Sequence, residues 1–213
     1  MKMDLHIHSK YSSDSLSEPK SILEYAKRIE FGAIAITDHN SIKGGIEGKK
    51  FGRQNNIIVV VGSEIDTDLG EVVGLFLNEK IENKGEMDFF EACDQIREQS
   101  GLVVLPHPLK NRITSEKMNA VELIEVFNAR RTRRENEGAR KLAKEYGKKG
   151  VGCSDAHFVF EVGKGYTEMK KECCDEEELM KALKKERLYA EGKGTPFIFH
   201  LPSAAIGLLK SKW

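Results

Sequence analysis

Residues 1–15 read MKMDLHIHSKYSSDS, and this stretch places two histidines in an apolar run. In an extended strand, residues two apart point to the same face, so His6 and His8 share one face. Asp14 follows a few residues later. Two neighbouring imidazoles in a protein interior need partners, which can be a metal ion or hydrogen-bonding groups. From this stretch alone both interpretations stay open.

The composition indicates one globular domain. The chain has 213 residues, of which 39% are hydrophobic and 32% are charged, and this suffices for a substantial core. Lysine plus arginine and aspartate plus glutamate each number 34, so the net charge is zero. A neutral chain argues against stable binding of duplex nucleic acid through a broad basic surface. We expect one domain over residues 1–213, with residues 190–213 as a tail packed on the barrel predicted below.

The arrangement of the cysteines and the lack of long apolar runs indicate the cellular compartment of the protein. None of the four cysteines belongs to a C-x-x-C pair, and two are adjacent in the sequence, which suits an ordinary disulfide poorly. The sequence shows no signal-peptide pattern, and no apolar run approaches the ~18 residues that span a bilayer. We therefore expect a reduced, cytoplasmic protein without a membrane partner.

Seven apolar segments predict β-strands, and several are nearly continuous runs of valine, isoleucine and leucine, as in strands buried on both faces. They are residues 3–8, 33–38, 57–65, 71–77, 102–107, 121–128 and 150–157. Amphipathic segments predict helices at residues 18–30, 87–99, 134–147 and 175–186. This alternation implies a mostly parallel sheet. We predict an α/β fold, a distorted seven-stranded (β/α)7 TIM-like barrel, with an open doubly wound sheet as the alternative.

Residues that can bind metals end five of these segments. The set comprises His6, His8, Asp38, His39, Glu64, His107, Asp155 and His157. In a parallel barrel the carboxyl ends of the strands share one face, so these side chains would gather there. Of the six histidines, only His200 lies away from a strand end. Because five independent coincidences are improbable, we predict a metal centre rather than structural histidines.

The number and kind of candidate ligands indicate more than one ion. A single catalytic zinc needs about three protein ligands, whereas at least seven candidates are available here. Two ions about 3.5–4 Å apart that share a bridging carboxylate use such a set. The candidates are imidazoles and carboxylates without thiolates, so manganese, zinc and iron all fit as divalent ions.

A series of short motifs points to a known family. D-L-H-I-H with Asp14 after it, I-T-D-H, G-S-E, P-H-P and S-D-A-H occur in this order between residue 3 and about residue 167. As a set they resemble the PHP (polymerase and histidinol phosphatase) domain. The resemblance implies a distorted seven-stranded barrel with a phosphoesterase centre of two or three metal ions.

The same resemblance implies roles for individual residues. A first ion would be held by His6, His8, Glu64 and Asp155. A second ion would be held by Asp14, His39 and His157. Glu64 and His107 would approach a third position, and Asp38 would orient a neighbouring histidine. Glu71 and Asn128 depart from the pattern, because some family members have histidine there, and this bears on the third site.

Substrate phosphate needs cationic partners, and two loops after predicted strands supply them. One loop carries Lys110 and Arg112, and the other carries an arginine run within residues 130–134. Arg130 is our first choice because it is closest to the strand end, with Arg112 next. For the arginine run, a solvated helix start is the alternative.

The leading hypothesis is hydrolysis of a phosphate ester by metal-activated hydroxide without a covalent intermediate. The catalytic candidates are His107, His157 and Asp155, with either histidine as a proton carrier. The substrate would be a small phosphomonoester, a nucleotide or the end of an oligonucleotide. Two alternatives stay open: an amidohydrolase-type C–N hydrolase, and a non-catalytic metal-binding or ribonucleoprotein subunit of the same fold. The sequence predicts neither the particular ester nor the oligomeric state.

Overall fold

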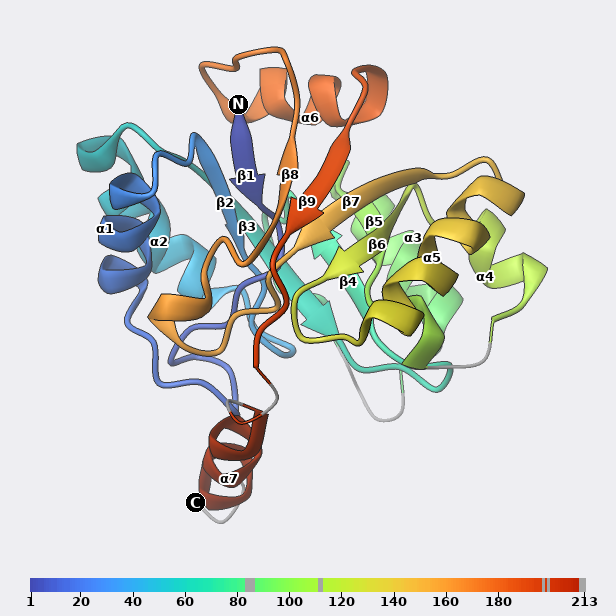
Figure 1. Cartoon of the computed structure of the whole chain (residues 1–213), viewed down its shortest axis with the longest axis horizontal. Helices are drawn as coiled ribbons and strands as arrows, with labels where there is room; N and C mark the ends of the chain where they lie inside the picture. The colour runs from blue at the N-terminus through green and yellow to red at the C-terminus, as the bar shows by residue number, and fades with distance from the viewer. Residues whose placement is uncertain (83–86, 111–112, 197, 199, 211–213) are drawn as a thin grey trace.

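The computed structural model describes residues 1–213 except 83–86, 111–112, 197, 199 and 211–213. Within that part of the chain, nine strands form one sheet in the order β7-β6-β5-β4-β3-β2-β1-β8-β9 (Figure 1). The strands are β1 (Lys2–Asp4), β2 (Ala33–Ile36), β3 (Ile58–Ile65), β4 (Val72–Leu75), β5 (Leu102–Leu105), β6 (Leu123–Asn128), β7 (Lys149–Cys153), β8 (Gly165–Glu168) and β9 (Tyr189–Gly192). The helices are α1 (Pro19–Arg28), α2 (Lys43–Asn55), α3 (Phe89–Glu98), α4 (Ser115–Asn119), α5 (Arg133–Glu145), α6 (Glu176–Lys185) and α7 (His200–Lys210). Among the described helices, none combines the length and apolar character needed to cross a membrane.

The sheet is mixed rather than mostly parallel. Parallel pairings join β1, β2 and β3 on one side and β5, β6 and β7 on the other. Antiparallel pairings place β4 between β3 and β5, and β8 between β1 and β9. The link after β3 is too short for a crossover helix, so β4 returns antiparallel. Its first residue, Val72, therefore pairs with Ile65 at the end of β3.

The two ends of the sheet approach each other, and the sheet forms a nearly closed barrel. The backbone N–H of Gly152 in β7 donates to Thr167 Oγ1 in β8 at 3.0 Å, and that hydroxyl donates to the Gly152 carbonyl at 2.9 Å. The α/β barrel class is confirmed, and all seven predicted strands are present, although β1 ends at Asp4 rather than at residue 8. The described sheet has nine strands instead of the predicted seven, and the two additional strands are β8 and β9. The sequence pattern does not predict them because both are short and only partly buried, so their hydrophobic pattern is weak.

Helix α2 packs directly on the sheet although its sequence does not predict a helix. The segment KGGIEGKKFGRQN contains four glycines, which are unfavourable in a helix interior. All four are buried against β2 and β3. A Cβ atom at Gly45 would lie 2.9 Å from Cα of Val61, so a side chain there would push the helix off the strand.

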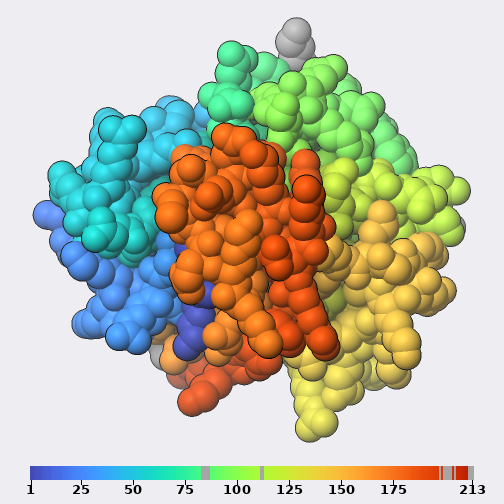
Figure 2. All heavy atoms as spheres, turned by 90° about the horizontal axis from the view of Figure 1, so that it is seen from above, coloured from blue at the N-terminus to red at the C-terminus, as the bar shows by residue number. Residues whose placement is uncertain are grey.

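Helix α6 covers the amino end of the barrel. Leu179 and Leu183 pack in the same core cluster as Met3 and Leu102, and Lys149 Nζ, at the start of β7, donates to the Leu183 carbonyl. Figure 2 shows the molecule from this side, with residues of α6, β8 and β9 in orange to red over its centre. The carboxyl ends of the parallel strands therefore open on the opposite side, toward α7 (Figure 1).

Candidate metal centre

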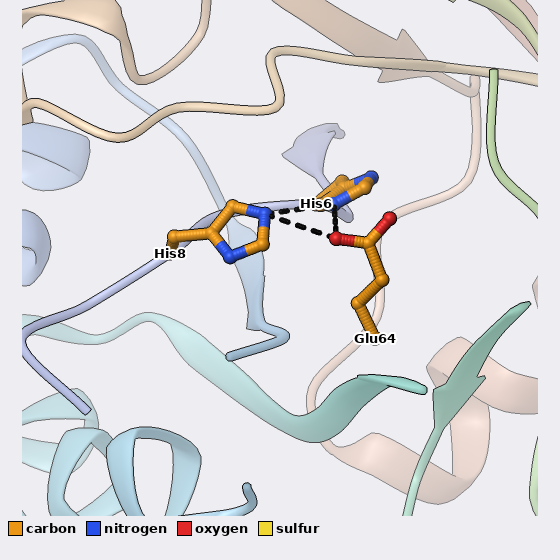
Figure 3. Close-up of side chains that lie close together, drawn as sticks. All are labelled: His6, His8 and Glu64. Atoms are coloured by element: carbon orange, nitrogen blue, oxygen red, sulfur yellow. Dashed lines mark hydrogen bonds and ion pairs between the residues drawn. The ribbon is translucent and has the colours of Figure 1, made fainter. Parts of the chain in front are cut away.

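The first group of candidate ligands comes from the segment after β1 and from the end of β3 (Figure 3). The Nε2 atoms of His6 and His8 are 3.0 Å apart, and both face Oε2 of Glu64, at 3.3 and 3.4 Å. Asp155, after β7, places Oδ1 3.8 Å from His6 Nε2 and 3.5 Å from His8 Nε2. All four side chains are buried, so the fold brings residues from both ends of the chain to one point.

Outward hydrogen bonds fix which nitrogen of each ring faces this group. His6 Nδ1 lies 2.7 Å from Oε1 of Glu125, and an ionised carboxylate can only accept, so Nδ1 carries a hydrogen. His8 Nδ1 lies 3.2 Å from Ser12 Oγ, and that hydroxyl donates to Asp14 Oδ1 at 2.7 Å, so it accepts from His8. When both rings are neutral, their Nε2 atoms therefore direct lone pairs at each other.

This donor set fits a divalent cation. Two nitrogen lone pairs that face each other beside a carboxylate repel unless a proton or a metal ion lies between them. Two nitrogens that are each about 2.0–2.1 Å from one ion are about 2.8–3.4 Å apart in octahedral or tetrahedral geometry, a range that includes the His6–His8 spacing of 3.0 Å. The candidate groups among the described residues contain imidazoles and carboxylates but no cysteine, which is compatible with manganese, zinc or iron.

A second group lies beside the first. Asp14 Oδ2 is 2.7 Å from His157 Nε2 and 3.6 Å from His39 Nε2. His157 Nδ1 donates to the backbone carbonyl of Asp155 at 2.9 Å, which again turns an Nε2 atom inward. His39 Nε2 is also 3.6 Å from Glu64 Oε2, so Glu64 lies between the two groups, where its carboxylate could bridge two ions.

A third group, at the edge of the same site, includes a lysine. His107 Nε2 is 3.1 Å from Glu64 Oε1, and its Nδ1 is 3.8 Å from Glu71 Oε2. Both carboxylate oxygens of Glu71 accept from Lys110 Nζ, at 2.7 and 2.8 Å. An ammonium group thus supplies positive charge here, and a metal ion at this position would compete with it for Glu71.

The ionisable groups in the cluster perturb one another strongly. Burial lowers the pKa of His6, but the carboxylates of Glu64 and Glu125 outweigh burial and raise that pKa well above its ordinary value. Burial also lowers the pKa of His39, which Glu64 and Asp14 raise to about 10. In the metal-free protein, protons on these two rings balance the carboxylates, and metal binding must displace them.

Comparison with known proteins places this arrangement in a family. Residues 133–188 match a family model described as PHP-associated. An uncharacterized protein of Methanocaldococcus jannaschii is 45% identical over 146 residues, which cover 61% of this chain and 82% of the relative. A Bacteroides vulgatus two-domain protein that contains a predicted PHP-like metal-dependent phosphoesterase has a similar structure, with a TM-score of 0.78, 19% identity, and coverage of 91% of this chain and 65% of that one. This chain belongs to the PHP domain family.

A second solved structure shares the fold. A lesion-specific endonuclease from Pyrococcus furiosus superposes with a TM-score of 0.65 at 17% identity, over 90% of this chain and 58% of the endonuclease. The PHP-family chain thus spans about two thirds or less of these two proteins. At identities of 19% and 17%, the similarity of this chain to these two structures concerns the fold alone. The M. jannaschii protein is much more similar in sequence, at 45% identity.

The sequence pattern does not identify Glu125 of β6, which holds several site residues of this PHP domain in place. Its Oε1 atom accepts from His6, and its Oε2 atom accepts from the backbone N–H of His107 and from Asn128 Nδ2, both at 2.9 Å. Asn128 also donates to Asp155 Oδ2 at 3.2 Å. The available signal is one carboxylate inside the apolar segment LIEVF, since a buried carboxylate needs partners.

Two of the candidate ligands have unusual backbone conformations. Asp155 and His107 adopt positive φ angles of 55° and 26°, which residues with side chains rarely do. Such strain costs on the order of 1–3 kcal/mol per residue and persists where the surroundings impose it. Its presence at two positions that face the same cavity is typical of a functional site.

Asp38 has a different role from the one that the family resemblance implied. Its carboxylate contacts no histidine ring through a hydrogen bond among the described residues. Instead it accepts from the backbone N–H of Ser9 at 2.5 Å and from the Ser9 hydroxyl at 2.8 Å. Asp38 therefore fixes the turn that follows His8 rather than the ring itself.

The predicted phosphate-binding cations lie in different environments. Arg112 lies outside the described residues. The side chain of Arg130 is only 7% exposed and donates to Glu161 Oε2 at 3.4 Å and to Ser203 Oγ at 2.6 Å. Lys110 is paired with Glu71, as described above. Each of the two described candidates thus already has a protein partner.

A cavity of about 320 Å³ opens at the metal centre and contains a further cation. It is lined by Asp14, His39, Glu64, Glu71, His107, Lys110, Arg130, Arg131, Asp155, His157 and Ser203. The Nε atom of Arg131 is buried and has no hydrogen-bond partner within the described part of the chain. Arg131, from the predicted arginine run, therefore adds a guanidinium group to the lining of this cavity.

Proposed function

We propose that this PHP-family chain hydrolyses a phosphate ester with two divalent metal ions, drawn from manganese, zinc and iron. The observation that carries the proposal is the convergence of inward-facing Nε2 atoms and carboxylates from both ends of the chain. The first ion would be held by His6, His8, Glu64 and Asp155. The second would be held by Asp14, His39 and His157, with Glu64 shared between the two positions.

Bound divalent ions would lower the pKa of a water molecule and neutralise charge on the phosphoryl oxygens. The residues of the chain supply the geometry around that chemistry. Glu125 keeps the His6 ring oriented, and Arg131 and Lys110 line the cavity where a phosphate would lie. Arg130 serves mainly to hold the wall of the cavity, because its charge is already paired with Glu161.

Three residues remain the proposed catalytic set, His107, His157 and Asp155. Nδ1 of His107 is buried and has no hydrogen-bond partner among the described residues, so it can carry a proton toward a leaving oxygen. Nδ1 of His157 already donates to a backbone carbonyl. His107 is therefore the better proton carrier, and Asp155 would help to hold the first ion.

The size and charge of the site favour a small substrate. A cavity of about 320 Å³ suits a phosphomonoester, a nucleotide or the exposed end of an oligonucleotide. A predicted PHP-like metal-dependent phosphoesterase and a lesion-specific endonuclease share this fold, which is compatible with a phosphate ester substrate and does not choose between mono- and diesters. The neutral net charge gives no support for duplex binding.

The test begins with protein purified without chelator, its bound metals measured by mass spectrometry. Hydrolysis of p-nitrophenyl phosphate, its bis-ester, nucleotides and short oligonucleotides is then followed with Mn²⁺, Zn²⁺ or Fe²⁺. We expect activity that a chelator abolishes and that Asp155→Asn reduces at least about 100-fold. Lys181→Met, a change on the exposed face of α6, is the matched control. Protein with both positions filled that cleaves none of these esters would refute the proposal.

A further inference from the structure

Helix α7, at the end of the described chain, lies beyond the end of the barrel that is opposite α6 (Figure 1), and its Ser203 lines the cavity at the metal centre. Lys210 Nζ donates to three backbone carbonyls, those of Lys10 at 2.9 Å, Ser12 at 2.8 Å and Ser15 at 2.7 Å. An ammonium group has three donors, so all of them are used on one loop. That loop carries Asp14, a candidate ligand of the second ion.

The position of this loop decides the geometry of two candidate ligands. Its Ser12 hydroxyl accepts from His8 Nδ1 and donates to Asp14 Oδ1. The backbone of α7 passes close to the same carboxylate, since a Cβ atom built on Gly207 would lie 3.5 Å from Cβ of Asp14. Three carbonyl oxygens that converge on one point repel one another unless a cation or other donor lies between them. The Lys210 ammonium supplies that cation.

A second connection joins α7 to the other side of the same metal position. Ser203 Oγ accepts from Arg130 at 2.6 Å, and Arg130 donates to Glu161 Oε2 at 3.4 Å. The same Glu161 oxygen accepts from the backbone N–H of His157 at 2.9 Å. Asp14 and His157 face each other across the second position, and α7 is connected to both of them.

We propose that α7 is a positioning element of the second metal position and that Lys210 is a positioning residue for Asp14. The inference rests on the proposed metal centre but not on the reaction catalysed there. Because this loop supplies Asp14 to the second position but touches the first only through the Ser12–His8 hydrogen bond, loss of the ammonium should weaken the second ion more than the first.

The test is titration of the metal-free full chain with Mn²⁺ by calorimetry. Lys210→Met removes the ammonium and keeps a long side chain. We expect one ion bound about 10- to 100-fold more weakly than by the wild type and the other weakened by clearly less than that. Lys210→Arg keeps the cation and should recover most of that loss. Leu209→Ala, which truncates a side chain on α7 that is 65% exposed, is the matched control and should bind both ions normally.

Hydrogen exchange distinguishes positioning from general destabilisation. In metal-free Lys210→Met, amides of residues 10–15 should exchange faster while those of β3 stay unchanged. Combined with Asp14→Asn, Lys210→Met should weaken the second ion no further. Wild-type affinity for both ions, equal weakening of both, or faster exchange throughout the chain would each overturn the inference. Two ions bound by a chain that cleaves no phosphate ester would instead refute only the proposed function.

Discussion

Glu125→Gln tests whether the outward hydrogen bonds determine metal binding. The substitution keeps the size of a buried side chain and replaces one acceptor oxygen with an NH₂ group. In the native site one oxygen serves His6, and the other serves two donors, the His107 backbone N–H and the Asn128 amide. Glutamine can satisfy only one of these sides at a time.

The expected magnitude follows from this count. If the amide oxygen faced His6, two buried donors would confront an NH₂ group, at about 1–3 kcal/mol each. In the reverse orientation the amide oxygen accepts from both donors and the NH₂ group faces His6. The His6 ring must then change tautomer, because its Nδ1 atom accepts from the NH₂ group and its hydrogen moves to Nε2. The Nε2 lone pair of His6, which would coordinate the metal ion, is then used to bind hydrogen. We expect affinity at the first position to fall about 10- to 100-fold, or about 1.4–2.7 kcal/mol.

The assay is competition for Zn²⁺ between the metal-free protein and a chromophoric chelator, at a pH where the protein is fully folded. Glu137→Gln is the matched control, because Glu137 is 53% exposed and pairs only with Arg133 in the described contacts. It should bind like the wild type. If Glu125→Gln also bound both ions with unchanged affinity, the His6 tautomer would not be set by Glu125 and the reasoning would be wrong.

Two further predictions concern protons and buried charge. The pKa of His39 is raised to about 10, so a proton must leave the ring before a metal binds, and affinity for Mn²⁺ should increase from pH 6 to pH 9. Calorimetry in buffers of different ionisation enthalpy would show the proton release. Absence of proton release would contradict the assignment. Arg130→Met leaves Glu161 buried without its cation and should lower the free energy of unfolding by about 3–5 kcal/mol in urea. Arg131→Met should change the free energy of unfolding by less than about 1 kcal/mol and should raise KM for a phosphate substrate. Equal effects of the two variants on stability would argue against a structural role for Arg130 and a substrate-binding role for Arg131.

The sequence predicts the parts of the site that strands position. Several of the five strand-end segments follow a nearly continuous apolar run, and a barrel places such ends on one face. His39 and Glu64 illustrate this, because parallel pairing of β2 with β3 continues into a bridge between these two residues. The contacts of Asp14 are different, since a residue in the polar loop YSSDS could equally belong to an exposed turn.

Other features depend on tertiary contacts that no local pattern reveals. Helix α2 forms despite its four glycines because its close packing on β3 outweighs their low helix propensity. Glu125 looks like an interruption of an apolar strand until His6, more than half the chain away, is placed against it. Lys210 is one lysine among many in the sequence, and only the folded loop shows that its three donors converge on one set of carbonyls.

The mixed topology of the sheet has a direct consequence for the site. In a strictly parallel barrel, the residue before a strand lies at the end remote from the active face. Because β4 runs antiparallel, the residue before it, Glu71, lies at the same rim as Glu64 and can approach His107. Lys110 reaches Glu71 from the segment after β5. The same reversal that breaks the regular strand–helix alternation therefore brings one more carboxylate, and with it one more cation, to the edge of the metal centre.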